Sequence, residues 1–321
     1  MKGATTVKVI YLQDLENVKN QLDSPLVLAI GYFDGIHLGH QKVISTAKDL
    51  AKKYGFKSAV MTFDPAPKAV LSKNPDAIKY ITLLEDKIEV IRNIGIDYLF
   101  IVPFTKEFAS LSPETFVDDY IRGLGVKHVV AGFDFTYGKF GKGNMETLES
   151  SSHGDYLVTT VGKIAKSNEK ISSTSIREMI QSGKVEEVPH YLGRFYTMSG
   201  KVVHGKKLGR KLGFPTANIE CSQKYVFPEN GVYIVRLFVL NKWVNGVASI
   251  GYNPTINQDQ TKKYLEVHII DFDQEIYDEP VIVEWRKYIR PELKFDYLDD
   301  LIKQIHEDKV VAIDYFKKCG L

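Results

Sequence analysis

Short apolar runs alternate with segments of helical periodicity through the first half of the chain. The runs are rich in β-branched and large apolar residues and predict strands at residues 7–11, 26–30, 58–63, 98–102 and 127–131. The segments between them predict helices at residues 14–22, 37–54, 82–94 and 112–121. We expect a capping box at Thr82 and Glu85 to open the third helix, and Pro113 stands at the first position of the fourth. This alternation predicts a doubly wound, Rossmann-like parallel sheet with helices on both faces.

The pattern changes near residue 187, after which strands dominate. They are predicted at residues 195–203, 232–240, 244–250, 263–272 and 281–288, with a tight turn at Asn241-Lys242 and one closing helix at 295–318. Several strands with short links predict a small antiparallel Greek-key β-barrel with a closing helix. We therefore expect an α/β domain over residues 1–186 and a β domain over residues 187–321.

The composition of the chain mainly excludes certain classes of protein and site. The chain has 321 residues, enough for two domains, and its net charge of +2 gives no electrostatic reason to expect nucleic acid or a membrane surface. It contains only two cysteines, which lack metal-type spacing, so neither a zinc site nor a disulfide framework is expected. No apolar run has the length of a membrane span, and the N-terminus lacks a signal-peptide core, so we expect a cytoplasmic protein. Nothing in the sequence indicates a protein partner.

A glycine-rich turn follows the second predicted strand and leads into a helix. Its glycines include Gly31 and Gly39, which let the backbone approach a ligand closely. His37 and His40 lie three residues apart at the start of the helix and share one of its faces. Because free N–H groups and the positive end of the dipole favour anions there, the turn is typical of a phosphate site. The alternative is a structural turn with two incidental histidines.

A second helix start carries hydroxyl groups. Ser172, Ser173 and Thr174 can cap a helix, and Arg177 would lie one turn further along, over the same end. Hydroxyls, free N–H groups and a guanidinium together indicate a second phosphate-binding group. Taken alone, an ordinary helix cap with a surface arginine explains these residues equally well.

Two loops after predicted strands carry proline and aromatic residues. Pro65 follows the third strand, and Phe133, Asp134 and Phe135 follow the fifth. Aromatic faces at the carboxyl ends of parallel strands are suited to a flat ring system. These aromatic residues fit packing within the loop and core equally well.

A basic, glycine-rich segment opens the second half. Gly205, Gly209 and Gly213 are spaced four residues apart among basic side chains that include Lys211. So much glycine disfavours a helix and favours a loop that folds its N–H groups over phosphates. A solvated basic loop is the alternative.

Oxygen-bearing side chains follow this loop. The stretch Phe214-Pro215-Thr216-Ala217-Asn218 predicts a rigid turn, in which Thr216 and Asn218 offer the hard oxygen ligands that Mg²⁺ accepts beside phosphate. Glu266 lies in a strand among apolar residues, where a carboxylate is costly unless it is paired or acts as a general base. An ordinary salt-bridged glutamate is the alternative for that position.

These motifs carry a family resemblance. The stretch GYFDGIHLGH followed by ISSTSIR resembles the nucleotidyltransferase superfamily, although the first half alone leaves the acceptor open. The stretches GKVVHGKKLGRKLGFPTANI and KYLEVHIIDFD resemble riboflavin kinases. The order of the two halves is similar to that of the bacterial bifunctional riboflavin kinase/FMN adenylyltransferases, also called FAD synthetases. Ala66 departs from the histidine that many members have in that loop.

The resemblance implies a transferase with two activities. The C-terminal domain would phosphorylate riboflavin to FMN with ATP, and the N-terminal domain would adenylylate FMN to FAD with release of pyrophosphate. ATP, riboflavin, FMN and FAD are then substrates or products, and Mg²⁺ is the implied cofactor.

It also implies roles for individual residues. Glu266, His37, His40 and Arg177 would be catalytic, with Thr216 and Asn218 holding the metal. Nucleotide binding is implied for Gly31, Phe33, Asp34, Gly39, Ser172, Ser173, Thr174, Gly205, Lys211, Gly213, Thr216 and Asn218. Flavin binding is implied for Pro65, Phe133, Asp134, Phe135 and Arg290. Two rivals stay open, an adenylyltransferase for another acceptor and a flavin-binding regulator without turnover.

Overall fold

The computed structural model describes residues 7–163, 165–166, 169–205, 213–252 and 263–321. The chain divides into two compact units, one made of Met1–Ile78 with Leu83–Ser172 and the other of Lys79–Thr82 with Ser173–Leu321. The segment Lys79–Thr82, which comes from the first half of the sequence, thus belongs to the second unit. The boundary expected between residues 186 and 187 stays a prediction.

The first unit is built on a parallel sheet of six strands in the order β1-β4-β3-β2-β5-β6. Every neighbouring pair in it is parallel. The strands are β1 (Lys8–Tyr11), β2 (Leu26–Ile30), β3 (Lys57–Asp64), β4 (Tyr98–Pro103), β5 (Val126–Gly132) and β6 (Leu157–Val161). The predicted Rossmann-like class is therefore confirmed. Strand β6 was not expected, because its Thr-rich sequence lacks a continuous apolar run.

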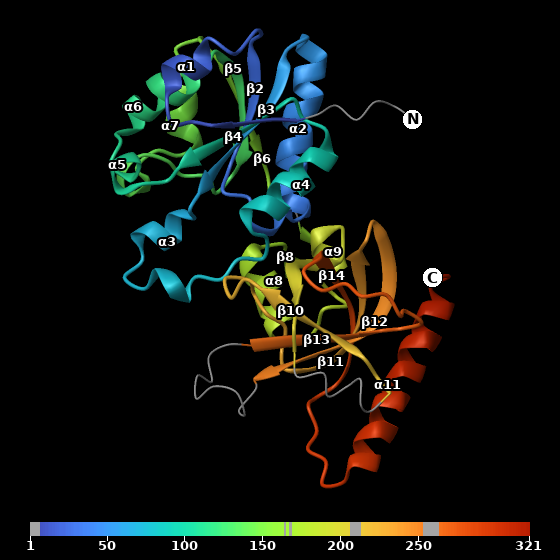
Figure 1. Cartoon of the computed structure of the whole chain (residues 1–321). Helices are drawn as coiled ribbons and strands as arrows, with labels where there is room; N and C mark the ends of the chain where they lie inside the picture. The colour runs from blue at the N-terminus through green and yellow to red at the C-terminus, as the bar shows by residue number, and fades with distance from the viewer. Residues whose placement is uncertain (1–6, 164, 167–168, 206–212, 253–262) are drawn as a thin grey trace. The chain divides into compact units, whose positions relative to one another are not determined.

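Helices cover both faces of this sheet (Figure 1). The helices of this unit are α1 (Leu15–Lys19), α2 (Leu38–Tyr54), α3 (Pro67–Leu71), α4 (Leu84–Ile94), α5 (Lys106–Ala109), α6 (Pro113–Phe116) and α7 (Met145–Ser150). The unit also contains the 3₁₀ turns η1 (Asp34–Ile36), η2 (Pro75–Ala77) and η4 (Lys139–Gly141) and the π-helical segment η3 (Val117–Arg122). The two short strands β7 (Ala165–Lys166) and β8 (Glu169–Lys170) pair with each other.

The ends of these helices follow from local chemistry. His37 caps α2 with its side chain, and Gly55 ends α2 in the left-handed conformation. Ser112 caps α6 with Pro113 at the first position, as predicted. The capping box expected at Thr82 is wrong: α4 begins at Leu84 after Leu83, which makes no side-chain cap. Thr82 is buried, and its hydroxyl oxygen lies 3.5 Å from Arg194 Nη2.

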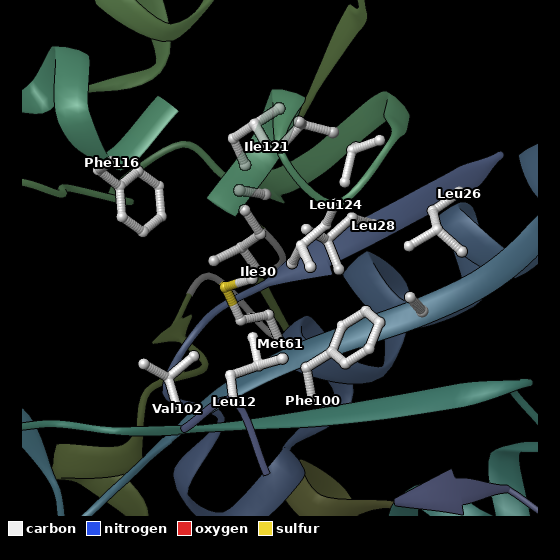
Figure 2. Packing of buried hydrophobic residues seen from close by; sticks show 14 of the residues in the cluster. Leu12, Leu26, Leu28, Ile30, Met61, Phe100, Val102, Phe116, Ile121 and Leu124 are labelled. Atoms are coloured by element: carbon white, nitrogen blue, oxygen red, sulfur yellow. The ribbon is translucent and has the colours of Figure 1, made fainter. Parts of the chain in front are cut away.

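Two apolar cores enclose the sheet because strand side chains alternate between its faces. Leu26, Leu28 and Ile30 of β2 point into the core shared with Phe116 and Ile121, which Figure 2 shows from close by. The alternate residues Val27 and Ala29 face the opposite core, beneath α2 and α4. Burial on both faces explains why β2 reads as a continuous apolar run.

The second unit is a closed antiparallel barrel in the order β10-β13-β12-β11-β14-β9, with β9 also pairing with β10. Its strands are β9 (Tyr196–Val203), β10 (Thr216–Cys221), β11 (Gly231–Val239), β12 (Lys242–Tyr252), β13 (Lys263–Ile269) and β14 (Pro280–Arg290). Helices α8 (Ser173–Gln181) and α9 (Pro189–Leu192) precede the barrel, and α11 (Leu298–Lys318) closes the chain. The predicted barrel and closing helix are therefore confirmed.

Two local predictions in the barrel are wrong. Thr216 to Asn218, expected in a rigid turn, open strand β10, because both edges of this segment find partners in β9 and β13. The hairpin turn lies at Leu240-Asn241, one residue earlier than expected. Both of its residues have positive φ, as tight turns of this type require, and Val239 pairs with Lys242.

Candidate active sites

The turn between β2 and α2 holds an unusual backbone. Phe33 and Ile36 have φ values of 55° and 44° although neither is glycine, and Gly35 lies between them at 76°. A Cβ added at Gly31 would lie 2.7 Å from the Phe33 ring, so only glycine fits there. Asp34 is buried within the turn. Such strain persists where surrounding contacts hold it, and it is common at functional sites.

The two histidines of this turn are in direct contact. Their rings stack with centroids 3.6 Å apart, and the backbone N–H of His40 donates to His37 Nδ1 at 3.2 Å. Because Nδ1 accepts this bond, the ring proton of His37 is on Nε2, which can act as a donor. Burial lowers the pKa of His40 well below its usual value, with smaller contributions from His37 and Lys87. The site therefore offers a neutral His40 and the Nε2 donor of His37 beside the N-terminus of α2, where Gly39 packs against the His37 ring.

The hydroxyl-bearing segment lies at the start of α8. Ser173 and Thr174 are its first two residues, Ser172 directly precedes it, and Arg177 follows one turn later. Arg177 Nε donates to the Lys79 carbonyl at 3.2 Å, a contact that joins α8 to the segment Lys79–Thr82 within the second unit. The histidine turn belongs to the first unit, so a joint site of the two segments stays a prediction.

An aromatic cavity of about 400 Å³ opens in the first unit. Phe135, which the sequence indicated, lines it together with Phe63, Phe104 and Phe108. These rings contact one another edge to face or at a tilt, with Phe104 and Phe108 5.4 Å apart. A cavity with aromatic walls of this kind accepts a flat apolar ring system.

The other predicted flavin residues of this unit do not line the cavity. Pro65 and Asp134 are exposed, and Phe133 is 46% exposed beyond the end of β5. Sequence reasoning missed Phe104 and Phe108. The Phe-rich stretch of residues 104–116 was the available signal, but only the fold brings it beside Phe135.

In the barrel, three predicted residues come together on neighbouring strands. Asn218 of β10 is directly opposite Glu266 of β13, and cross-strand partners share a face. Thr216 lies two residues before Asn218 and therefore on the same face, and its hydroxyl donates to Glu266 Oε2 at 3.4 Å. A carboxylate, a hydroxyl and an amide thus form one cluster of oxygen-bearing groups.

This cluster lies between two cavities. One, of about 100 Å³, is lined by Thr216, Ala217, Phe272 and Tyr277. The other, of about 310 Å³, is lined by Thr216 and Glu266 on the barrel side and by residues of α11. Thr216 borders both, so the arrangement can hold two molecules with their reactive ends at the same cluster.

The loop glycines and Arg290 complete the barrel site. Gly205 packs so closely that an added Cβ would lie 2.0 Å from Asn218 Nδ2, whereas Gly213 is exposed with a φ of 82°. Lys211 lies outside the described residues. Arg290 lines the larger cavity, but its guanidinium binds Asp308 of α11, a partner that sequence reasoning missed.

Comparison with known proteins relates both units to flavin enzymes. A family model described as FAD synthetase matches residues 19–175, and one described as riboflavin kinase matches residues 192–316. The bifunctional riboflavin kinase/FMN adenylyltransferase of Listeria monocytogenes is 46% identical over 312 residues, covering 97% of this chain and 99% of that protein. Its namesake from Bacillus subtilis is 45% identical over 311 residues, covering 97% and 98%.

A solved structure is similar over nearly the same length. A crystal structure described as a macrolide-efflux protein from Streptococcus pneumoniae matches with a TM-score of 0.87 at 35% identity, covering 95% of this chain and 98% of that one. In the parts of this chain that the structure describes, no helix has the length and apolar content needed to cross a membrane.

Proposed function

The chain belongs to the family of bifunctional riboflavin kinase/FMN adenylyltransferases, and we propose that its two units divide the two reactions between them. The riboflavin kinase model matches the part of the chain that forms the barrel, and the FAD synthetase model matches the part that forms the parallel sheet. The protein thus converts riboflavin to FMN and FMN to FAD, using ATP in both steps.

In the barrel, Glu266 accepts the proton of the ribityl 5′-hydroxyl of riboflavin. The resulting oxygen nucleophile attacks the γ-phosphorus of ATP, and ADP leaves. The nucleotide occupies the smaller cavity beside Thr216, and riboflavin occupies the larger one beneath α11. This placement is supported by the position of Thr216 on both cavities and by its contact with Glu266.

Magnesium fits the oxygen donors of this cluster. Thr216 and Asn218 offer a hydroxyl and an amide oxygen on one face of β10. Among the described residues no three His, Cys, Asp or Glu side chains form a cage for a metal ion. Two protein oxygens beside the phosphates of ATP is a usual way to hold Mg²⁺, which neutralises charge on the transferred phosphoryl group.

In the sheet unit, the phosphate of FMN attacks the α-phosphorus of a second ATP, and pyrophosphate leaves. His37 and His40 stabilise the leaving group. Ser173, Thr174 and Arg177, at the start of α8, keep the phosphate-binding role in this reaction that the sequence predicts. The backbone of Gly31, Phe33, Asp34 and Gly39 and the hydroxyl of Ser172 bind the nucleotide. FMN phosphate is already an anion near neutral pH, so no strong protein base is required.

The aromatic cavity supports a place for the flavin ring in that step. Phe135 and its neighbours provide flat apolar walls after β5, while Pro65, Phe133 and Asp134 stand at the ends of β3 and β5. We propose that the ring lies against Phe135 and that these three residues act at its edge. We also propose that both reactions take place in the cytoplasm, where ATP is present, and without a nucleic-acid partner, since the net charge is only +2.

The observation that carries the kinase assignment is the cluster of Thr216, Asn218 and Glu266 between two cavities. Its test is Glu266→Gln in the full chain, with both reactions assayed separately. Loss of a general base lowers a rate by about 10²- to 10⁴-fold, so FMN formation should nearly vanish while FMN-to-FAD conversion stays at the wild-type rate. Loss of both activities would show that the proposed division between the units is wrong.

A further inference from the structure

A buried lysine lies beneath the histidine turn. Lys87 of α4 is only 2% exposed, and its Nζ donates to the Tyr32 carbonyl at 2.7 Å and to Thr62 Oγ1 at 3.3 Å. The ammonium group also lies 4.0 Å from the centroid of the Tyr32 ring. These contacts of Lys87 join α4 to the carboxyl ends of β2 and β3, where the histidine turn begins.

The charge of this lysine is costly to bury. Burial lowers the pKa of Lys87 to about 8, while the carboxylates of Asp34 and Asp64 act in the opposite direction. A methylene chain alone would fill the same space without desolvating an ammonium group. A charge kept under these conditions, in contact with a strained turn, is a candidate for function.

The contacts of Lys87 act directly on the turn. The Tyr32 carbonyl accepts from both Lys87 Nζ and Thr62 Oγ1, the latter at 2.8 Å. Two donors therefore hold the orientation of this carbonyl group. That carbonyl directly precedes Phe33, whose left-handed backbone shapes the turn before His37. The lysine charge also helps to keep His40 neutral, because it contributes to the lowered pKa of that imidazole.

We propose that Lys87 is a positioning residue for adenylyl transfer: its ammonium group holds the Tyr32 carbonyl, and with it the turn from Gly31 to His37, in the shape that receives the ATP phosphates. This inference rests on the proposed adenylyltransferase function of the first unit. Lys87 acts through the backbone of the turn. Its positive charge beneath the site also favours the anionic leaving group.

The test is Lys87→Met in the full chain, which keeps an unbranched side chain only one atom shorter and removes the charge and both hydrogen bonds. We expect kcat for FAD formation from FMN to fall about 100-fold, with KM for FMN changed less than about threefold, because the contact shapes the transition state more than the ground state. Riboflavin kinase activity of the same preparation should stay at the wild-type rate.

Lys48→Met is the matched control. Lys48 of α2 also donates to a backbone carbonyl of α4, that of Ile94 at 2.5 Å, but it is exposed and away from the turn. It should leave FAD formation within about twofold of wild type, as for surface changes. An equal loss in both variants would assign the effect to helix packing and overturn the proposal.

A pH profile separates positioning from a merely structural role. In wild type, kcat/KM for FAD formation should fall as the pH rises through about 8, because the free enzyme then loses the Lys87 proton while Asp34 and Asp64 stay ionised and His40 stays neutral. The Lys87→Met variant should lack this decline. A wild-type profile without it would contradict the proposal.

Thr62→Val covers the case in which Lys87→Met does not fold. It keeps the lysine charge and removes one of the two donors to the Tyr32 carbonyl, so a loss of about three- to tenfold in kcat is expected. Wild-type rates in Thr62→Val, or in a folded Lys87→Met chain, would overturn the proposal. A wild-type chain that forms no FAD from FMN and ATP would instead refute the proposed function itself.

Discussion

Arg290 of β14 and Asp308 of α11 form a two-pronged ion pair within the second unit. Arg290 Nε donates to Asp308 Oδ1 at 2.9 Å, and Nη2 donates to Oδ2 at 2.7 Å. The Asp308 residue is only 3% exposed, and both side chains line the larger cavity of the barrel. The pair therefore holds the closing helix α11 against the barrel at the proposed riboflavin site. Arg290 contributes to the shape of that site by positioning α11.

Asp308→Asn should weaken the contact between α11 and Arg290. Breaking a buried ion pair on one side costs about 3 kcal/mol, because an arginine charge is left without its partner. We expect the free energy of unfolding of the second unit to fall by about that amount and KM for riboflavin to rise, measured by denaturant unfolding and kinase assays. Asp314→Asn, an exposed position on the same helix, should change neither. Unchanged stability in Asp308→Asn would show that the pair contributes nothing net.

Gly205→Ala should affect the kinase reaction alone. The added methyl group would meet Asn218 Nδ2 at 2.0 Å and displace this proposed magnesium ligand. Overpacking of this kind costs about 1–3 kcal/mol, and because this cost is borne at Asn218 we expect about a five- to 150-fold loss of FMN formation in steady-state assays. Gly162→Ala, where nothing lies within 4 Å of the new atom, is the control. Full kinase activity in Gly205→Ala would argue against the role of Asn218.

His40 should make the first unit sensitive to acid. Its pKa is well below the ordinary 6.5 in the folded chain, chiefly through burial, so below about pH 6.5 the unfolded chain binds a proton that the folded chain does not. The free energy of unfolding should therefore be fully present above that pH and decline as the pH falls. His128 of the same unit, whose pKa burial also lowers, adds to this trend.

His40→Gln should reduce the slope of stability against pH between about 6.5 and 5, measured by thermal unfolding across that range. His306→Gln, an exposed position on α11, should leave the slope as in wild type. Equal slopes in His40→Gln and wild type would mean that folding does not lower the pKa of His40.

The segment Lys79–Thr82 should be required for full stability of the barrel unit. The Tyr80 N–H donates to the Lys224 carbonyl at 2.8 Å, and its own carbonyl accepts from Val226 N–H at 2.9 Å. Lys79 Nζ donates to the Gln223 carbonyl at 2.8 Å.

A fragment of residues 173–321 keeps the rest of the second unit but leaves these groups without their partners. We expect it to unfold at a lower temperature than the second unit within the full chain, since each lost hydrogen bond contributes about 1 kcal/mol. Differential scanning calorimetry of both proteins checks this. A fragment as stable as the intact unit would show that the segment is dispensable.

Several helices and strands could be predicted from local sequence patterns, because residues close in sequence determine them. The apolar run of β2 follows from burial on both faces, and α2 begins at its histidine cap and ends at Gly55. The start of strand β10 was wrongly predicted as a turn, because Phe214-Pro215 has the composition of a turn. The strand forms because this segment pairs with β9 and β13, and no local pattern indicates that pairing. The capping box at Thr82 failed for the same reason, since its hydroxyl lies in a tertiary contact with Arg194.

The sequence by itself determined the succession of helices and strands, the two glycine-bearing motifs and the residue types that bind phosphate, because each depends on neighbours a few positions away. Only the tertiary structure decided that Asn218 faces Glu266, that Arg290 binds Asp308 and that Lys87 lies beneath Tyr32. Those contacts join residues that are 18 or more positions apart. Their geometry depends on strand register and helix packing, which no local pattern encodes.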